Sequence, residues 1–159
     1  MREEDLGFLD RAPKTWTFEE EVHAPQEVVF AAISADPSTW TWFPRLSSGS
    51  YDGDGPHGVG SKRQVKMSGV TYKETMLAWE APSRWAYRVD KSSVPLAHAL
   101  VEDWVVEPRG EHAAVVRWTF AIDPKALFKA GMPAAPTVMG RLFKKAMANL
   151  SEELSRRQA

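Results

Sequence analysis

The sequence predicts an α+β fold in which a curved, seven-stranded antiparallel sheet wraps around a long C-terminal helix, with two short helices between strands 1 and 2. Strand-like segments are joined by short turns that contain Gly or Pro, which is typical of antiparallel hairpins. A single long amphipathic segment near the C-terminus can cover the apolar face of such a sheet. Because seven strands cannot lie flat under one helix, we expect the sheet to curl and to leave a hollow beneath the helix.

The first part of the chain predicts an arm, a strand and two short helices. Residues 1–14 show no periodicity, and we expect a flexible N-terminal arm followed by a single domain over 15–159. Alternation over 15–23 predicts a half-buried strand. Pro25 opens one short helix, and a second runs through Trp42. The inward face of the first strand is expected to carry Trp16, Phe18, Glu20 and Val22.

The middle of the chain alternates between strand-like runs and turns. A short strand over 46–51 precedes the loop DGDGPHGVG, which lacks the spacing of a phosphate-binding loop and is interpreted as a hairpin or rim loop. Turn residues such as Ser68-Gly69 and Pro108-Arg109-Gly110 separate the later strands, which predicts a meander. Those strands are expected at 61–68, 70–80, 84–91, 97–107 and 113–123.

The C-terminal segment, from about residue 137 to residue 156, predicts the long helix. A connector over 123–136 with three prolines precedes it. Arg156 and Arg157 suit the negative end of a helix. Apolar residues recur on one face at helical spacing. This stripe consists of Met139, Leu142, Phe143, Ala146, Met147, Leu150 and Leu154.

Composition excludes several classes of function. The chain has 20 basic and 21 acidic residues and no basic stripe, so we expect no nucleic-acid partner. No apolar run approaches the roughly 20 residues of a membrane span, and the acidic segment after Met1 is not a signal peptide. Cysteine is absent, which rules out disulfides and thiolate nucleophiles and is compatible with the cytoplasm, where we expect the protein to lie.

Four segments resemble the START-like, helix-grip superfamily (SRPBCC), in particular its polyketide cyclase/dehydrase and lipid-transport branch. They are the passage VHAPQEVVFAAISADPSTWTWFP, the Gly-rich approach GVGSKRQV, the hairpin ETMLAWEAPSRWAYRV and the C-terminal helix, and together the resemblance covers about residues 15–157. Members include lipid carriers, plant hormone-binding proteins, aromatase/cyclases, chaperone-activating domains and toxin-like proteins. The resemblance implies the helix-grip fold and an apolar cavity, but these structural segments do not select a reaction.

Polar residues on the predicted inward faces are the candidates for chemistry. The sequence has no Gly-x-Ser-x-Gly elbow, and its four histidines lack the spacing of metal ligands, so we expect neither a metal nor a cofactor. A buried charge is costly unless it is paired. These residues therefore either form an Arg–carboxylate pair with no further role, or anchor a ligand and act as acid or base. The candidates are Arg63, Glu74, His98 and Glu102, with Glu20 on the first strand.

Aromatic and Met side chains are the candidates for ligand-binding walls. The chain has seven Trp, which suit an apolar ligand site but suit a solid core equally well. Trp40, Trp42 and Phe43 are expected to close one end of the hollow. The predicted ligand-binding residues are Trp85, Tyr87, Trp104, Trp118 and Phe120 from strands, and Met139, Phe143 and Met147 from the helix.

Three functions fit this sequence. The first is a carrier or sensor of a small hydrophobic, aromatic or lipid-like ligand. The second is a metal-free enzyme of the cyclase, aromatase or dehydratase type that uses acid–base residues in the cavity. The third is a protein-interaction module, which aromatic residues such as Trp79 on the outer face of the sheet would favour. The sequence leaves the ligand open, and also whether the protein is a monomer or a homodimer.

Overall fold

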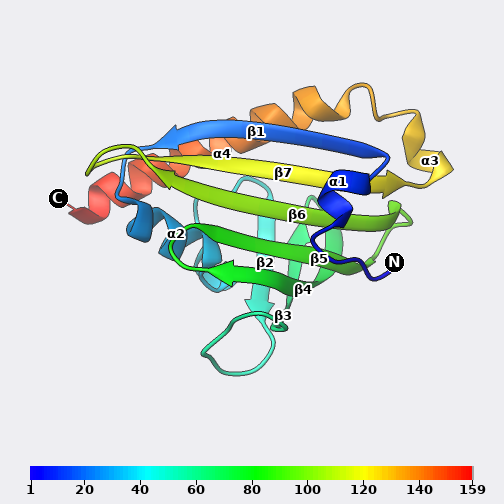
Figure 1. Ribbon diagram of the computed structural model, residues 1–159, viewed down its shortest axis with the longest axis horizontal. Helices are drawn as coiled ribbons and strands as arrows, with labels where there is room; N and C mark the ends of the chain where they lie inside the picture. The colour runs from blue at the N-terminus through cyan, green and yellow to red at the C-terminus, as the bar shows by residue number, and fades with distance from the viewer. Residues whose placement is uncertain (159) are drawn as a thin grey trace.

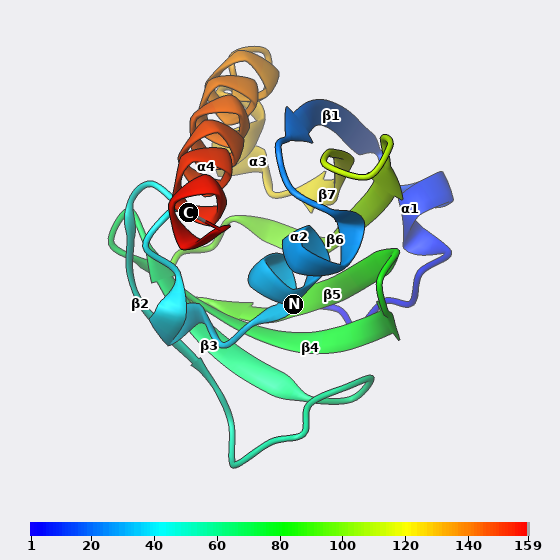
Figure 2. The same ribbon diagram turned by 90° about the vertical axis from the view of Figure 1, so that its left-hand side faces the viewer.

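A seven-stranded antiparallel sheet in the order β1-β7-β6-β5-β4-β3-β2 forms the body of the computed structural model, which describes residues 1–158. The sheet curls around the C-terminal helix, so the predicted fold class is confirmed (Figures 1 and 2). The first two strands in sequence lie at opposite edges of the sheet. The strands are β1 Lys14–Val22, β2 Leu46–Tyr51, β3 Lys62–Met67, β4 Val70–Glu80, β5 Arg84–Ser92, β6 Ala97–Pro108 and β7 Ala114–Pro124.

Two short helical elements connect the edge strands, as predicted: α2 Gln26–Ser34 and the 3-10 helix η1 Pro37–Thr39. The Asp36 carboxylate accepts a hydrogen bond from the Ser38 amide at 2.9 Å, which caps η1. The same carboxylate accepts one from the Tyr51 amide at 3.0 Å. One side chain thus joins the start of η1 to the end of β2.

The long helix α4, Ala135–Gln158, lies on the concave side of the sheet, after the single turn of α3, Ala126–Lys129 (Figure 2). Helix α4 starts slightly before the predicted residue 137, with Pro136 in its first turn, where a missing N–H costs nothing. Its stripe buries Phe143, Met147 and Leu150. A Cβ added at Gly140 would lie 3.2 Å from the Phe18 ring, so a residue without a side chain lets α4 approach β1 closely.

The N-terminal segment, predicted to be a flexible arm, is docked on the outer face of the sheet. It contains the short helix α1, Phe8–Arg11, and strand β1 already begins at Lys14. Phe8 is buried against Ala99, Val101 and Ala121. Small residues on the outer faces of β6 and β7 leave room for the Phe8 ring, a pairing that periodicity within the arm could not reveal.

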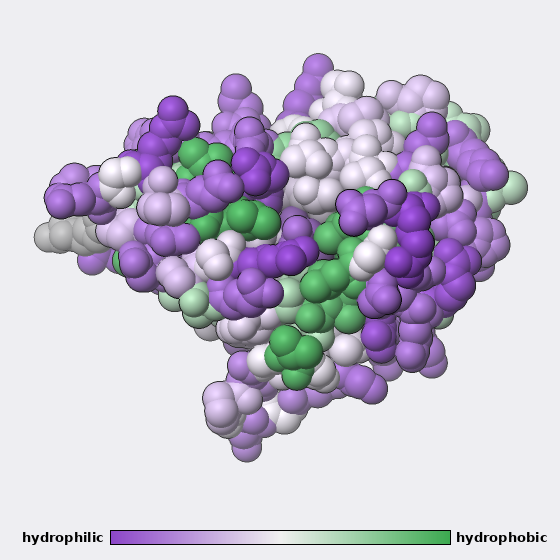
Figure 3. All heavy atoms as spheres, viewed as in Figure 1, coloured by the Kyte–Doolittle hydropathy of each residue, from purple (hydrophilic) through white to green (hydrophobic). Residues whose placement is uncertain are grey.

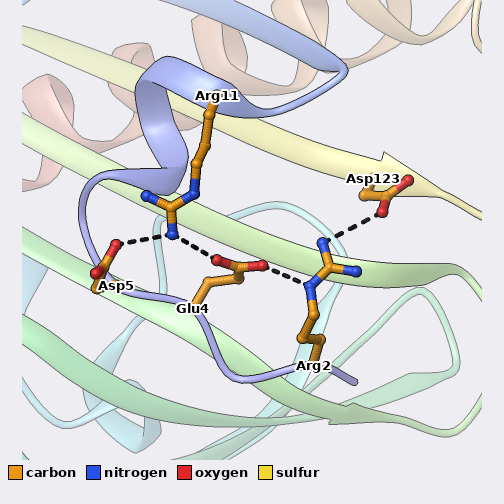
Figure 4. A network of polar contacts seen from close by, with 5 residues as sticks. All are labelled: Arg2, Glu4, Asp5, Arg11 and Asp123. Atoms are coloured by element: carbon orange, nitrogen blue, oxygen red, sulfur yellow. Dashed lines mark hydrogen bonds and ion pairs between the residues drawn. The ribbon is translucent and has the colours of Figure 1, made fainter.

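Polar contacts fix the same segment in place. The Glu4 carboxylate accepts hydrogen bonds from Arg2 at 2.6 Å and from Arg11 at 2.8 Å, and Arg2 also reaches Asp123 at 3.3 Å (Figure 4). The Arg2 amide donates to the carbonyl of His98 at 2.7 Å. The arm therefore covers the outer faces of β6 and β7, while Met1 packs at its end against the cluster that contains Val89, Leu100 and Ile122.

The outer surface of the sheet is mixed in character. Its rim is largely hydrophilic, while apolar atoms gather near the middle of the face in view (Figure 3). Among the residues that the structure describes, no helix has both the length and the apolar composition that a membrane crossing requires.

Candidate functional site

A cavity of about 220 Å³ lies between the concave face of the sheet and the N-terminal half of α4. Strands β3 to β7 each contribute inward-facing side chains, and the segment after η1 contributes two aromatic residues. The wall is mostly apolar, with three charged residues among its members. The lining consists of Trp40, Phe43, Leu46, Arg63, Val65, Met67, Tyr72, Glu74, Tyr87, Leu96, Leu100, Glu102, Trp104, Trp118, Phe120, Met139 and Leu142.

Glu102 is the carboxylate at the centre of this wall. Strand register places it opposite Tyr87 on β5 and Phe120 on β7. Its Oε2 atom accepts a hydrogen bond from the Tyr87 hydroxyl at 2.6 Å and another from the Trp118 indole N–H at 2.8 Å. Within the described residues no hydrogen bond reaches Oε1. Two neighbouring strands therefore orient the carboxylate through its Oε2 atom alone.

Arg63 and Glu74 form a buried ion pair beside it. They are direct cross-strand partners on β3 and β4, and Arg63 Nε donates to Glu74 Oε2. The guanidinium carbon lies 4.6 Å from the centre of the Trp85 ring and 4.5 Å from that of Tyr87. Such distances are typical of cation–π contacts. The rings of Trp40 and Tyr51 lie further out, at 5.3 and 5.9 Å.

Because aromatic rings enclose the guanidinium, we interpret Arg63 as a residue that stabilises the fold and not as one that contacts a ligand. The Arg63 side chain is 2 % exposed and that of Glu74 is 4 % exposed. Arg63 Nη1 is buried without a hydrogen-bond partner among residues 1–158, and the surrounding ring faces compensate for this in part. The charge of Arg63 is neutralised by Glu74, so the pair adds no net charge to the cavity.

Burial and neighbouring charges shift the pKa values of Glu102, Glu74 and Arg63. Burial, reinforced by the nearby Glu74 carboxylate, raises the pKa of Glu102 to about 7, although the hydrogen bonds from Tyr87 and Trp118 act in the opposite direction. Burial raises the pKa of Glu74 as well, against the effect of Arg63. Burial acts to lower the pKa of Arg63, but the Glu74 carboxylate together with Tyr87 and Tyr51 outweighs it, and the pKa is raised. Glu102 therefore changes charge near neutral pH.

Tyr87 connects the ion pair with Glu102. Its ring contacts the Arg63 guanidinium and its hydroxyl donates to Glu102. Burial, followed by the Glu102 and Glu74 carboxylates, raises the pKa of Tyr87 well above its ordinary value. Tyr87 thus acts as a neutral hydrogen-bond donor at every pH where Glu102 titrates.

The structure brings three of the four predicted acid–base candidates together and separates the fourth. Arg63, Glu74 and Glu102 line the cavity. His98 does not, because the pairing of β6 with β7 shifts by a residue between Ala97 and Ala99, and His98 is exposed. The prediction that His98 faces the cavity mouth assumed an unbroken alternation along β6, which this irregularity removes.

The predicted wall residues divide into two groups. Tyr87, Trp104, Trp118, Phe120 and Met139 line the cavity. The other three contribute to the solid core instead, because neighbouring rings and helix α2 fill the space around them. These are Trp85, Phe143 and Met147, each at most 1 % exposed.

Sequence reasoning missed the aliphatic part of the wall. Leu96 lies in the turn before β6, and Leu46 and Met67 face each other at the end of the β2–β3 hairpin. Trp40 and Phe43 close one side of the cavity, whereas Trp42 is buried in the core. The alternation of β3 placed Met67 on the face of Arg63, but nothing in the sequence indicates that turn residues reach the same space.

Metal-ligating groups do not gather anywhere in the part of the chain that the structure describes: no three His, Asp or Glu side chains lie in a suitable arrangement. The cavity has largely aromatic walls, and Glu102 Oε1 accepts no hydrogen bond from the described residues. This arrangement can hold an organic molecule through one polar contact and apolar burial.

Comparisons with known proteins identify the class to which this fold belongs. A START superfamily protein from Mycobacterium smegmatis superposes with a TM-score of 0.73 at 11% identity, over 89% of this chain and 97% of that one. A norcoclaurine synthase point mutant from Thalictrum flavum, in complex with a transition-state analogue, gives a TM-score of 0.64 at 18% identity, over 89% of this chain and 96% of that one. At such identities these likenesses show the fold alone, that of the START-like, or SRPBCC, superfamily.

The family within that class follows from the sequence. Residues 15–155 match the polyketide cyclase/dehydrase and lipid transport family, and the chain belongs to it. An uncharacterised protein of Mycobacterium tuberculosis is 28% identical over 120 residues, which cover 73% of this chain and 70% of that protein. The predicted family is therefore confirmed.

Proposed function

We propose that the protein binds one small, mostly apolar ligand in the cavity beside Glu102, as a carrier or sensor. The observation that carries this proposal is an internal space with largely aromatic walls, in which Glu102 Oε1 accepts no hydrogen bond from the described residues. In a core of ordinary density such a space is costly, because its lining loses dispersion contacts. The geometry is that of a ligand pocket, in which few polar groups orient a largely apolar molecule.

The volume narrows the class of ligand. An apolar cavity of roughly 150 Å³ holds benzene. The cavity here, at about 220 Å³, suits a molecule of one or two rings and is too small for a two-chain lipid. We therefore propose an aromatic or short aliphatic ligand, in place of the broader lipid-like class that the sequence suggested.

Native mass spectrometry tests this proposal. Protein purified without organic solvent is sprayed under native conditions, and any bound molecule is identified after extraction. Protein from which such molecules have been removed is then titrated with the neutral compound 2-naphthylmethanol. We expect a one-to-one complex that Met139→Trp prevents by filling the cavity. If neither a co-purified ligand nor saturable binding is found, the proposal is wrong.

A second candidate function is acid–base catalysis of a cyclase or dehydratase type. The observation that favours it is a carboxyl with a pKa of about 7, held by Tyr87 and Trp118 with its other oxygen open to the cavity. Once a substrate is known, Glu102→Gln is expected to lower kcat by about 100-fold or more. Full turnover by that variant would exclude this role for Glu102.

The third hypothesis, a protein-interaction module, depended on an outward-facing Trp79, and the structure does not place Trp79 in that way. Trp79 was predicted on the outer face, but the β4–β5 register shifts between Met76 and Ala78 and places Trp79 opposite Trp85. Its ring packs on that of Tyr51 with centres 5.8 Å apart.

The cytoplasmic location stays a prediction.

A further inference from the structure

When Glu102 is ionised, the side chains that line the cavity carry one more negative charge than positive charge. Arg63 is the one cation in the lining, and its charge is already matched by Glu74 through a buried hydrogen bond. The remaining partners of Glu102 are neutral donors, the Tyr87 hydroxyl and the Trp118 indole. An ionised Glu102 is therefore a half-buried anion without a counter-charge, which is unfavourable unless a ligand supplies one.

The walls around Glu102 suit a cation that carries an apolar body. Trp118 and Trp104 stack with ring centres 5.4 Å apart, and Phe120 lies 5.9 Å from Trp118. Aromatic surfaces favour cations over anions because the ring faces carry negative partial charge. At the same time they bury the apolar surface of a ring or a short chain.

We propose that the ligand is a small aromatic or aliphatic amine, whose ammonium group donates to Glu102 Oε1 while its apolar part fills the space toward Met139 and Leu142. This inference rests on the proposed function. A ligand carboxylate would place a second anion beside Glu102, with Arg63 shielded by four rings and engaged by Glu74. A neutral alcohol can form the hydrogen bond but leaves the charge of Glu102 unmatched.

The other titratable groups near Glu102 come from three strands. They are Arg63 on β3, Tyr72 and Glu74 on β4, and Tyr87 on β5; burial followed by the charge of Glu102 raises the pKa of Tyr72. Strand β7 and helix α4 present Trp118, Phe120, Met139 and Leu142 to the same space. Glu102, with its pKa raised to about 7, is thus a group whose charge changes when the cavity is titrated around neutral pH.

Calorimetric titration with three matched compounds tests the inference. 2-Naphthylmethylamine and 2-naphthylmethanol have the same number of heavy atoms, and 2-naphthoate provides the anion. At about pH 8, where Glu102 is mostly ionised, we expect the amine to bind at least ten times more tightly than the alcohol, and the naphthoate to bind most weakly.

The pH dependence gives a second readout that needs no variant. The amine stays protonated from about pH 5.5 to about pH 8, while the ionised fraction of Glu102 rises roughly thirtyfold for a pKa near 7. Amine affinity is therefore expected to increase up to roughly thirtyfold over this range, while alcohol affinity changes little. Equal pH profiles for amine and alcohol would overturn the inference.

A substitution and a matched control complete the test. Glu102→Gln keeps an oxygen that Tyr87 and Trp118 can donate to, and is expected to bind the alcohol but to lose the preference for the amine. Glu107→Gln changes an exposed carboxylate of the same strand and should leave both affinities unchanged. If Glu102→Gln keeps the amine preference, or naphthoate binds best, the inference fails and the proposed function stands. If none of the three compounds binds the wild-type protein, the inference fails, and the proposed function fails with it when no ligand co-purifies.

Discussion

The two halves of helix α4 face very different interiors. The C-terminal half buries Met147 and Leu150 in a solid core, which also contains Phe30 and Ile33 of α2. The N-terminal half turns Met139 and Leu142 toward the cavity. We call these regions the solid half and the hollow half. One helix with a continuous apolar stripe thus serves as core along part of its length and as pocket wall along the rest.

The difference comes from what lies opposite the helix. Helix α2 enters the curved sheet from one end, between β1 and β2, and its buried face fills the space there (Figure 2). Among residues 1–158 no comparable helix enters the hollow half, where the concave face carries the Arg63–Glu74 pair and Glu102. The placement of one nine-residue helix therefore decides where the interior is packed and where it is open.

Truncating a leucine in each half gives the largest contrast. Leu150→Ala removes a fully buried side chain from the solid half and is expected to cost about 4 kcal/mol of unfolding free energy. Leu142→Ala enlarges a space that is already open and is expected to cost about 1 kcal/mol. Urea denaturation of both variants measures the difference. Equal losses would mean that the two halves are packed alike.

Breaking the buried ion pair is the next largest change. Glu74→Gln leaves the Arg63 charge buried and unmatched, which is expected to cost about 3 kcal/mol. The double variant Arg63→Met, Glu74→Gln removes both charges and should recover most of that loss. Urea denaturation of the single and double variants measures this coupling. A double variant less stable than Glu74→Gln would show that Arg63 contributes through its aromatic contacts more than through its charge.

The stability of the hollow half should depend on pH through Glu102. Its pKa is about 7 in the folded protein and near 4.5 in the unfolded chain, so the folded state holds this proton more tightly. The free energy of unfolding should therefore fall as the pH rises from about 4.5 to about 7, by about 1 to 3 kcal/mol after screening by cavity water. Denaturation of the wild type and of Glu102→Gln at both pH values isolates this contribution. An equal pH dependence in the two proteins would contradict the assignment to Glu102.

Enlarging a methionine in each half gives the smallest effect on stability. Met147→Phe overpacks the solid half and is expected to cost about 1 to 2 kcal/mol. Met139→Phe extends into the cavity, so stability should change by less than about 0.5 kcal/mol while the affinity for 2-naphthylmethanol falls. Thermal unfolding and calorimetric titration of both variants check this pair. A larger loss of stability in Met139→Phe would mean that the cavity is already filled.

The sequence predicted the architecture because its signals are local. Alternation, turn residues and the stripe of α4 place nearly every strand within a residue or two, and they put Arg63, Glu74 and Glu102 on inward faces. The wrong predictions of side-chain orientation occur where the hydrogen-bond register between two strands shifts. An irregular register exposes His98 and turns Trp79 inward, and such a shift depends on pairing with a distant strand. The division between solid and hollow halves was not predictable either, because Met139 and Met147 look alike within one stripe.

The seven tryptophan indoles allow the central claim, a cavity that binds a small ligand, to be tested directly. Trp40, Trp104 and Trp118 line the cavity, whereas Trp16, Trp42 and Trp79 do not. In ¹⁵N-correlated NMR spectra of the assigned protein, 2-naphthylmethylamine should shift the indole N–H signals of Trp104 and Trp118 most, in a saturable manner. The signals of Trp16 and Trp79 should barely move. Saturable shifts at Trp16 or Trp79 without shifts at Trp104 and Trp118 would contradict the account.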